Sequence, residues 1–182
     1  LSGGADVNDV DEQGSTPLMA AAAHGHVEVV DMLLAAEANV NAARDDGYTA
    51  LYIASLQGHL VSVQHLIASG ADVHAVDNKG CTSMMSASEN GHDQVVQYLS
   101  SAGAKVDAAL PDGATALHMA SEKGQAKVVK TLLSAGADVN AARNDGDTSL
   151  MAASHNPHLG SISSNVEVVD MLLAAQANAN AA

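Results

Sequence analysis

Glycine recurs along this chain of 182 residues with a period of 33, and this period limits the possible folds more than any other feature. One series comprises Gly14, Gly47, Gly80, Gly113 and Gly146, and a second comprises Gly25, Gly58, Gly91 and Gly124. The second series is next due at position 157, which is occupied by Pro157. Self-similarity with a period of about 20 to 50 residues is typical of proteins built from stacked units. The sequence therefore predicts an elongated stack of similar units with an irregularity in the last one.

Each unit contains the signature of a first helix. A threonine stands at the same place in every unit: Thr16, Thr49, Thr82, Thr115 and Thr148. Its hydroxyl can accept a hydrogen bond from a free N–H at a helix start, and the residue after it is proline or small. We expect each first helix to end about nine residues later, at the second glycine series. Glycine can adopt the left-handed conformation there without a steric penalty from a Cβ atom.

Apolar residues at helical spacing predict a second helix in each unit, for example Val27, Val30 and Leu33. A glycine closes this helix in three units: Gly70, Gly103 and Gly136. Glu37 and Gln176 occupy that place in the first and last units. The same left-handed geometry at these two residues would cost about 1 kcal/mol each.

Two further patterns describe how the units connect. Alanine holds the same place inside all five first helices: Ala21, Ala54, Ala87, Ala120 and Ala153. A small side chain at this place lets a neighbouring helix approach, so we interpret the column as the seam between units. Asp-Gly pairs at 46–47, 112–113 and 145–146 favour tight turns and predict a hairpin-like loop between consecutive units.

The composition argues against several classes of protein. A formal net charge of −14 would repel nucleic acid and anionic membranes. The sequence contains no apolar run long enough to span a membrane and no basic region ahead of an apolar segment. The single cysteine, Cys81, rules out an internal disulfide framework. We expect a monomeric intracellular protein, cytoplasmic by default, that contacts neither nucleic acid nor membrane.

The repeated pattern resembles that of the ankyrin repeat family, D-x-x-G-x-T-P-L-H-x-A-x-x-x-G-H-x-x-V-V-x-L-L-L-x-x-G-A-D-V-N-A. The segment DEQGSTPLMAAAAHGHVEVVDMLLAAEANVNA (11–42) follows it almost throughout. The resemblance implies an all-α solenoid of stacked antiparallel helix pairs with projecting β-hairpin-like loops. It also implies a noncatalytic role in protein binding, without a cofactor. One domain is expected over 1–182, with a partial repeat at 1–10 and full repeats at 11–43, 44–76, 77–109, 110–142 and 143–182.

The chain departs from the family pattern in two respects. The histidine of the T-P-L-H motif is present only as His118, so the hydrogen bond that it makes to a neighbouring turn is in doubt elsewhere. Both ends resemble interior segments: LSGGADVN (1–8) parallels LSAGADVN (133–140), and 166–182 matches 15 of the 17 residues of 27–43. We expect the chain to be a fragment of a longer array.

The fifth unit carries seven additional residues between its two helices. Because Pro157 replaces the capping glycine, we expect the first helix to stop near Asn156 and a longer loop to span 157–165. Two interpretations remain open. Loops in such arrays tolerate insertions at little entropic cost, and a longer loop can also enlarge a binding surface.

Metal binding and catalysis are poorly supported. His26, His59 and His92 hold equivalent places in successive units and are therefore too far apart to converge on one zinc ion. His155 and His158, in the inserted segment, are the least implausible metal-binding pair. No nucleophile or phosphate-binding motif occurs, and we interpret Cys81 as an exposed turn residue.

Asparagine closes the A-D-V-N motif of several units: Asn8, Asn41, Asn140 and Asn180. The family resemblance implies that such residues are sometimes hydroxylated. Hydrogen bonding in the hairpins is the alternative role, and it is the one that we expect.

Variable places in the units predict a partner surface, since residues needed for stacking recur and those facing the concave side are free to vary. The candidate contact residues lie in the hairpins and at the ends of the first helices: Glu12, Gln13, Ser15, His24, Asp45, Asp46, Tyr48, Leu56, Gln57, Asn78, Lys79, Cys81, Glu89, Asn90, Asp112, Glu122, Lys123, Asn144, Asp145, Asp147 and His155. They match the contact positions of the ankyrin family.

The hairpin edge is strongly acidic. Segments 9–15, 44–48, 77–81, 110–114 and 143–147 carry nine acids and three bases, a net charge of −6. We hypothesise a partner with a basic face, anchored by Tyr48 and Leu56. The alternatives are an acidic surface that only keeps the array in solution, a spacer in a longer array, or an accessory domain that presents substrates to an enzyme.

Overall fold

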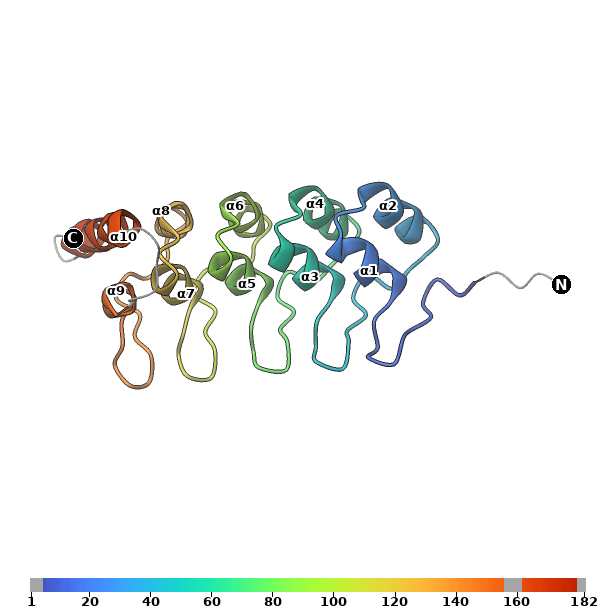
Figure 1. Ribbon diagram of the computed structural model, residues 1–182, viewed down its shortest axis with the longest axis horizontal. Coiled ribbons are helices and arrows are strands. Elements are labelled where there is room, and N and C mark those ends of the chain that lie inside the picture. Colours follow the sequence, from blue (N-terminus) through green and yellow to red (C-terminus); the bar gives the residue numbers. More distant parts are fainter. Residues whose placement is uncertain (1–4, 156–161, 180–182) are drawn as a thin grey trace.

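The computed structural model describes residues 5–155 and 162–179, and these residues form five consecutive helix pairs. The first helices are α1 (Pro17–Ala23), α3 (Ala50–Gln57), α5 (Ser83–Glu89), α7 (Ala116–Glu122) and α9 (Ser149–Ser154). The second helices are α2 (Val27–Ala35), α4 (Leu60–Ala68), α6 (Asp93–Ser101), α8 (Ala126–Ser134) and α10 (Ile162–Ala179). Each set forms a row along the array, and hairpin loops project from the row of first helices (Figure 1). The predicted all-α solenoid is confirmed.

Threonine starts the first helices as the sequence predicts. Thr16, Thr49 and Thr82 have extended backbone conformations, and each side chain accepts a hydrogen bond from the N–H three residues later. The N···O distances are 3.3, 3.2 and 3.2 Å, respectively. This bond satisfies one of the amides that a helix start leaves without an internal partner, so the threonine column sets where each pair begins.

Glycine ends the first helices for two separate reasons. Gly58 adopts a left-handed conformation with φ +75°, which disfavours any other residue. A Cβ atom at Gly58 would also lie only 2.4 Å from Nδ1 of His92, in the following unit. The His92 ring is held there because its Nε2–H donates to the carbonyl of Leu56 (3.0 Å). Gly58 is therefore both a helix terminator and part of the contact between units.

The residue that closes the second helix is left-handed in the first unit but not in the last. Glu37 has φ 63° and therefore carries the left-handed strain considered above. Gln176, its equivalent in the last unit, lies inside α10 and does not. In the first unit the following turn is fixed by the next unit: Oδ1 of Asn41 accepts from the N–H of Asp72 (2.8 Å), and its Nδ2 donates to the carbonyl of Gly70 (3.0 Å). Among the described residues no unit follows α10, and the helix continues.

Replacing Glu37 by glycine is expected to raise the melting temperature by roughly 2–4 °C. The change removes the strain of a left-handed conformation, about 1 kcal/mol, at an exposed residue. In a domain of this length, 1 kcal/mol corresponds to a change in melting temperature of roughly 2–4 °C. Thermal unfolding followed by circular dichroism measures it. Glu28→Gly, at an exposed position within α2, is the control and should lower the melting temperature. An unchanged or lower value for Glu37→Gly would show that the strain is absent.

The seven-residue insertion lengthens a helix as well as the connection. The first helix of the fifth unit ends at Ser154, close to the predicted stop near Asn156. The second helix begins at Ile162, so the loop expected over 157–165 is wrong for 162–165. These four residues include neither glycine nor proline and can extend the helix toward its N-terminus. Residues 156–161, with Pro157 and His158, lie outside the described residues.

The core is a continuous strip of small and medium side chains between the two helix rows. The alanine column is buried in every unit, with exposed fractions of 4% or less. Leucine or methionine at the second helical position is also buried, as at Leu18, Leu51 and Met84. A strip of this kind has no single centre, since each unit is covered by its neighbours. Within the described residues, no helix is both long and apolar enough to cross a bilayer.

The connecting loops are hairpins held by single antiparallel bridges. Such bridges join Ala43 to Thr49 and Val76 to Thr82, and the next two loops repeat them. Neighbouring hairpins are tied together as well: the Asn78 side chain donates to the carbonyl of Asp45 (2.7 Å), and that of Asn144 to the carbonyl of Pro111 (3.0 Å). These links align the hairpin tips into one continuous edge.

Candidate partner-binding surface

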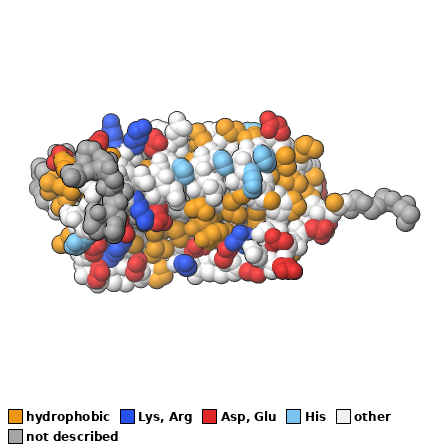
Figure 2. All heavy atoms as spheres, in the orientation of Figure 1, with side chains coloured by type: hydrophobic (Ala, Val, Ile, Leu, Met, Phe, Trp, Pro, Cys, Tyr) orange, Lys and Arg blue, Asp and Glu red, His pale blue; other side chains and the backbone are white. Residues whose placement is uncertain are grey.

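The structure places the predicted contact residues along the hairpin edge and the adjoining ends of the first helices, and none of them is buried. Six are half-buried: Ser15, Asp46, Tyr48, Leu56, Cys81 and Asp147. The others are exposed. Figure 2 shows acidic side chains along the hairpin edge and a band of hydrophobic side chains between this edge and the helices. The surface therefore combines an acidic rim with an apolar strip.

Two of the three bases on the hairpin edge are neutralised within the molecule. Arg44 forms an ion pair with Asp46, and Arg143 pairs with Glu122 (3.1 Å) and Asp147 (3.6 Å). Burial tends to raise the pKa of Asp46, but the hydrogen bonds from Arg44 and from the Tyr48 N–H, together with the charge of Arg44, outweigh it and keep this pKa below its usual value. The negative charge presented to a partner comes mainly from the remaining acids.

Those remaining acids lie at the hairpin tips. Glu12, Asp45, Asp112 and Asp145 are exposed and have no ion-pair partner among the residues that the structure describes. Asp112 and Asp145 each accept one backbone N–H of their own turn, which fixes the carboxylate without neutralising it. The tips therefore form a row of negative charges, and those of Asp112 and Asp145 are held in place.

Tyr48 lies on this surface in a fixed orientation. Its ring stacks on that of Tyr52, with centroids 4.2 Å apart and an angle of 27° between the planes. The Arg44 guanidinium covers the Tyr48 ring at 5.3 Å from the centroid, a cation–π arrangement. Tyr52 is buried, whereas Tyr48 is half-exposed. A large aromatic side chain that is already ordered loses little entropy when a partner covers it.

Sequence reasoning identified Tyr48 but missed its support. Neither the stacking of its ring on Tyr52 nor the guanidinium of Arg44 over it was predicted. Tyr48 immediately precedes the N-cap Thr49, and the local pattern for a residue at this place pairs it with the fourth helical residue, Ile53, rather than with Tyr52.

Cys81 is not the exposed turn residue that the sequence predicted. It follows the turn, is half-buried and packs against the core, and its thiol lies 3.7 Å from the carbonyl oxygen of Thr82. Burial raises the pKa of the Cys81 thiol, which disfavours the reactive thiolate. Burial is also the main cause of the raised pKa of the neighbouring Tyr52 phenol. Cys81 therefore belongs to the packing behind Tyr52 and contributes little accessible surface.

Ion pairs between units connect several other candidate residues. Lys123 lies 3.3 Å from Glu89 in the preceding unit. All members of this pair and of the Arg143–Glu122 pair are partly solvent-accessible, so each pair is worth at most about 1 kcal/mol. A binding partner could displace them at little cost.

The histidine column has a structural role that the contacts make explicit. His59 and His92 each reach the carbonyl of a residue 36 positions earlier, near the end of the preceding first helix, at 3.2 and 3.0 Å. Gln125 makes the same contact at the next place (3.1 Å). His118 is buried, which lowers its pKa, and its Nε2 lies 3.2 Å from the carbonyl of Asp147, in the next hairpin. The described residues contain no group of three or more His, Cys, Asp or Glu suited to a metal ion.

The asparagine column contributes hydrogen bonds, as expected, and the side chains of Asn8 and Asn41 bond to the next unit rather than within their own hairpin. Asn8 accepts from the N–H of Asn39 (2.8 Å), and Asn41 is engaged through both side-chain atoms. The Asn140 backbone N–H donates to Asp138 within its own turn (2.9 Å). Asn180 lies outside the described residues.

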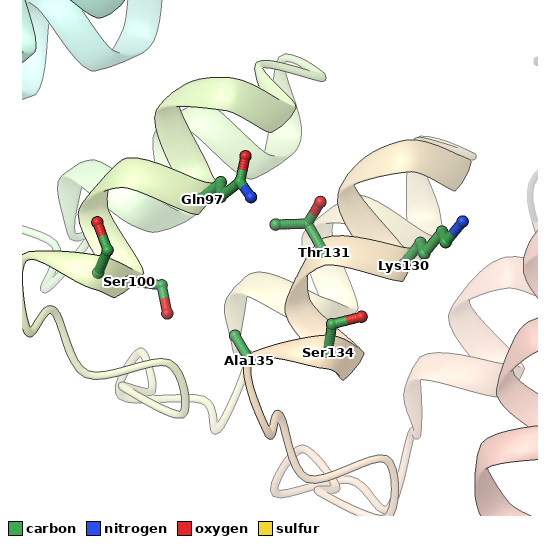
Figure 3. A pocket seen from close by; sticks show the side chains of 7 residues that line it. Gln97, Ser100, Lys130, Thr131, Ser134 and Ala135 are labelled. Atoms are coloured by element: carbon green, nitrogen blue, oxygen red, sulfur yellow. The ribbon is translucent and has the colours of Figure 1, made fainter.

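A shallow groove lies on the other side of the molecule, between α6 and α8 (Figure 3). Gln97 and Thr131 point toward one another across it, whereas Lys130 points away. Ser100 and Ser134, whose side chains are short, also line it. Apart from Lys130 the residues that line it are uncharged, and none is aromatic, so it offers neither the row of charges nor the aromatic anchor found on the hairpin surface.

Comparison with known proteins identifies the repeat. A family model described as ankyrin repeats (3 copies) matches residues 1–77, 53–143 and 84–182. No curated protein matches the chain.

Proposed function

Since the chain belongs to the ankyrin repeat family, whose members are generally noncatalytic protein-interaction modules, we propose that it binds a partner protein with a basic face. The partner would lie along the hairpin edge and the adjoining ends of the first helices. One observation carries the proposal: a row of exposed, internally unpaired carboxylates runs beside an ordered, half-exposed tyrosine. Acidic tips would steer a basic partner toward the surface, and Tyr48 would anchor it.

The charge and the anchor have separable roles. Exposed carboxylates act over a distance and mainly accelerate association, an effect that salt screens. Tyr48 and Leu56 are half-buried and gain from further desolvation, which mainly slows dissociation. The proposed complex should therefore show both a steep salt dependence and sensitivity to loss of one aromatic ring.

Changing Asp45, Asp112 and Asp145 to asparagine is expected to weaken partner binding about tenfold or more and to flatten its salt dependence. Asparagine preserves the oxygen that accepts the turn N–H, so the hairpins should remain folded. The partner captured by the immobilised wild-type chain would be identified and purified, and its dissociation constant measured by calorimetry at several salt concentrations.

A matched control removes the same charge elsewhere. Glu28→Gln, Glu167→Gln and Asp170→Asn change three exposed acids on the second helices. This triple variant should bind within about twofold of the wild type. For the anchor, Tyr48→Ala should weaken binding far more than Tyr98→Ala, which removes a half-buried tyrosine from α6. If the two triple variants weakened binding equally, or if the two tyrosine variants did, the binding surface would have to lie elsewhere.

A further inference from the structure

A groove lies near the middle of the array, between the loop that follows α4 and the loop that follows α6. Its volume is about 250 Å³. Four apolar residues and two basic ones contribute to its lining: Val73, Val76, Ala104, Ala108, His74 and Lys105. Both basic residues are exposed, and neither forms an ion pair with a described residue. Helix pairs pack on both sides of the groove, so it stays open although its neighbouring units are present.

Three residues of the groove differ from those that hold the same places in most other units. His74 stands where other loops have asparagine or aspartate, and so does Lys105. Val76 stands where three other full repeats have alanine, and its side chain is 51% exposed. The other units stack without these side chains, so stacking does not account for them.

The replacements leave a backbone donor without the partner that it has at other junctions. The Asp72 N–H donates to Oδ1 of Asn41 in the preceding loop (2.8 Å), and the same link recurs at two other junctions (2.8 and 3.0 Å). The Lys105 N–H holds the equivalent place, but within the described part of the chain it donates to no acceptor. The reason is that His74, in the preceding loop, has no side-chain oxygen.

The amide of Asn41 shows what this junction lacks. Besides accepting from Asp72, it donates from Nδ2 to the carbonyl of Gly70 (3.0 Å). Gly103 is the equivalent of Gly70, and its carbonyl accepts no hydrogen bond from a described residue. An unpaired carbonyl and an unpaired N–H therefore precede and follow Ala104, which lines the groove. A ligand that carries an N–H beside an oxygen acceptor can satisfy both.

We propose that this groove binds the C-terminal end of a partner protein whose last residue is apolar. The terminal carboxylate would accept from the Lys105 N–H and lie between the Lys105 ammonium and the His74 ring. The N–H of the last residue would donate to the Gly103 carbonyl, and its side chain would lie against Val73 and Val76. Capture of a terminal carboxylate by free backbone N–H groups is a known mode of peptide recognition. None of these residues belongs to the hairpin surface, so the proposal does not depend on the proposed function.

The size and charge of the groove favour a chain end over other ligands. Pockets that enclose a small molecule usually measure about 300–1,000 Å³, so a groove of about 250 Å³ accommodates one side chain and its carboxylate while the rest of the ligand lies outside. The two acids that adjoin the basic residues in the sequence are held by other bonds. Asp72 accepts the N–H of His74 (2.8 Å), and Asp107 accepts that of Asp138 (3.0 Å). Neither acid therefore takes the place of the proposed carboxylate.

An NMR titration of the isotope-labelled chain with the peptide acetyl-Gly-Gly-Ser-Val tests the proposal. The peptide should shift the Lys105 amide signal saturably, with a dissociation constant of about 1 mM or below, because this N–H gains a charged acceptor. The same peptide with a C-terminal amide should bind at least about tenfold more weakly, since it lacks the charge. Isovalerate should also bind about tenfold more weakly, since it has no N–H for the Gly103 carbonyl.

Two variants close the site with residues that the other loops already carry. Lys105→Asp and His74→Asn should each abolish binding while the chain stays folded, because both restore the common pattern of the repeat. Lys79→Asp makes the same change of charge on an exposed hairpin residue, and it should bind the peptide within about twofold of the wild type. Val76→Ala should weaken binding about fivefold through lost apolar contact. Melting curves check that each variant is folded.

Several results would overturn the proposal. If the carboxylate and amide peptides bound equally well, or if Lys105→Asp bound as tightly as the wild type, the basic side chains would have no part in recognition. If isovalerate bound as tightly as the peptide, the ligand would be a free carboxylate and not a chain end. If the Lys105 signal did not move at about 10 mM peptide, the groove would not be the binding site.

Discussion

Replacing Gly58 by alanine is expected to lower the free energy of unfolding by roughly 2–4 kcal/mol, although it adds only one methyl group. About 1–2 kcal/mol comes from forcing a residue with a Cβ atom into the left-handed conformation. The rest comes from His92, whose ring would have to move away from a Cβ atom only 2.4 Å from its Nδ1. Moving the ring would break its hydrogen bond to the carbonyl of Leu56, worth about 1 kcal/mol, and open the packing between two units. Urea unfolding followed by circular dichroism measures the loss.

Gly70→Ala separates the two causes. Gly70 has φ +91°, in the same left-handed region, but a Cβ atom there would meet nothing within 4 Å. This variant should therefore lose only the conformational part, about 1–2 kcal/mol. In addition, His92→Ala should remove most of the extra cost of Gly58→Ala, so that the two substitutions are less than additive. Equal losses at Gly58 and Gly70 would show that the contact with His92 contributes nothing.

The difference between these two glycines also shows how far the sequence could predict the fold. Both were predicted as left-handed helix ends, because that property belongs to one residue and its immediate neighbours. The second role of Gly58 depends on a ring 34 positions later in the chain, whose position depends on how the units stack. Local patterns predict helix boundaries, whereas the contact between units appears only once the units are placed together.

Gln176 and Glu37 show the same limit of prediction from the sequence. Their surroundings in the sequence are nearly identical, yet Glu37 is left-handed and Gln176 is helical. The turn after Glu37 is held by hydrogen bonds from Asn41 to the following unit. Nearly the same motif therefore adopts two conformations, and in the first unit the turn is accompanied by contacts that the motif alone does not predict.

The candidate binding surface was predictable to a similar extent. Variable places identified Tyr48 and the acidic tips, since exposure follows from the position in a unit. The stacking of Tyr48 on Tyr52 within one unit and the packing of Cys81 of the next unit behind Tyr52 were both missed. The sequence predicts the net charge of the hairpin edge. It does not predict the ion pairs that Arg44 and Arg143 form, and these pairs determine which acids are free to contact a partner.

Replacing Ser55, Ser88 and Ser121 together by alanine is expected to stabilise the protein by about 3 kcal/mol and to raise its melting temperature by roughly 6–12 °C. The three serines hold the same place in successive units and are fully buried. Their hydroxyl oxygens have no hydrogen-bond partner. A buried hydroxyl without a partner costs about 1 kcal/mol or more, and alanine is also the better helix former. Calorimetry on each single variant and on the triple variant measures the gain.

The first and last units supply the template and the control for this prediction. Ala22 holds the same place in the first unit and is fully buried, so alanine fits the site without rearrangement. Ser154 holds it in the last unit, but there the side chain is exposed and donates to the carbonyl of Leu150 (2.8 Å). Ser154→Ala should therefore give little or no gain. If replacing a buried serine stabilised the protein no more than Ser154→Ala does, the buried hydroxyls would have to be hydrogen-bonded in solution. A gain found only at Ser55, Ser88 and Ser121 would mean that buried hydroxyl oxygens without a hydrogen-bond partner, and not helix propensity alone, limit the stability of the stack.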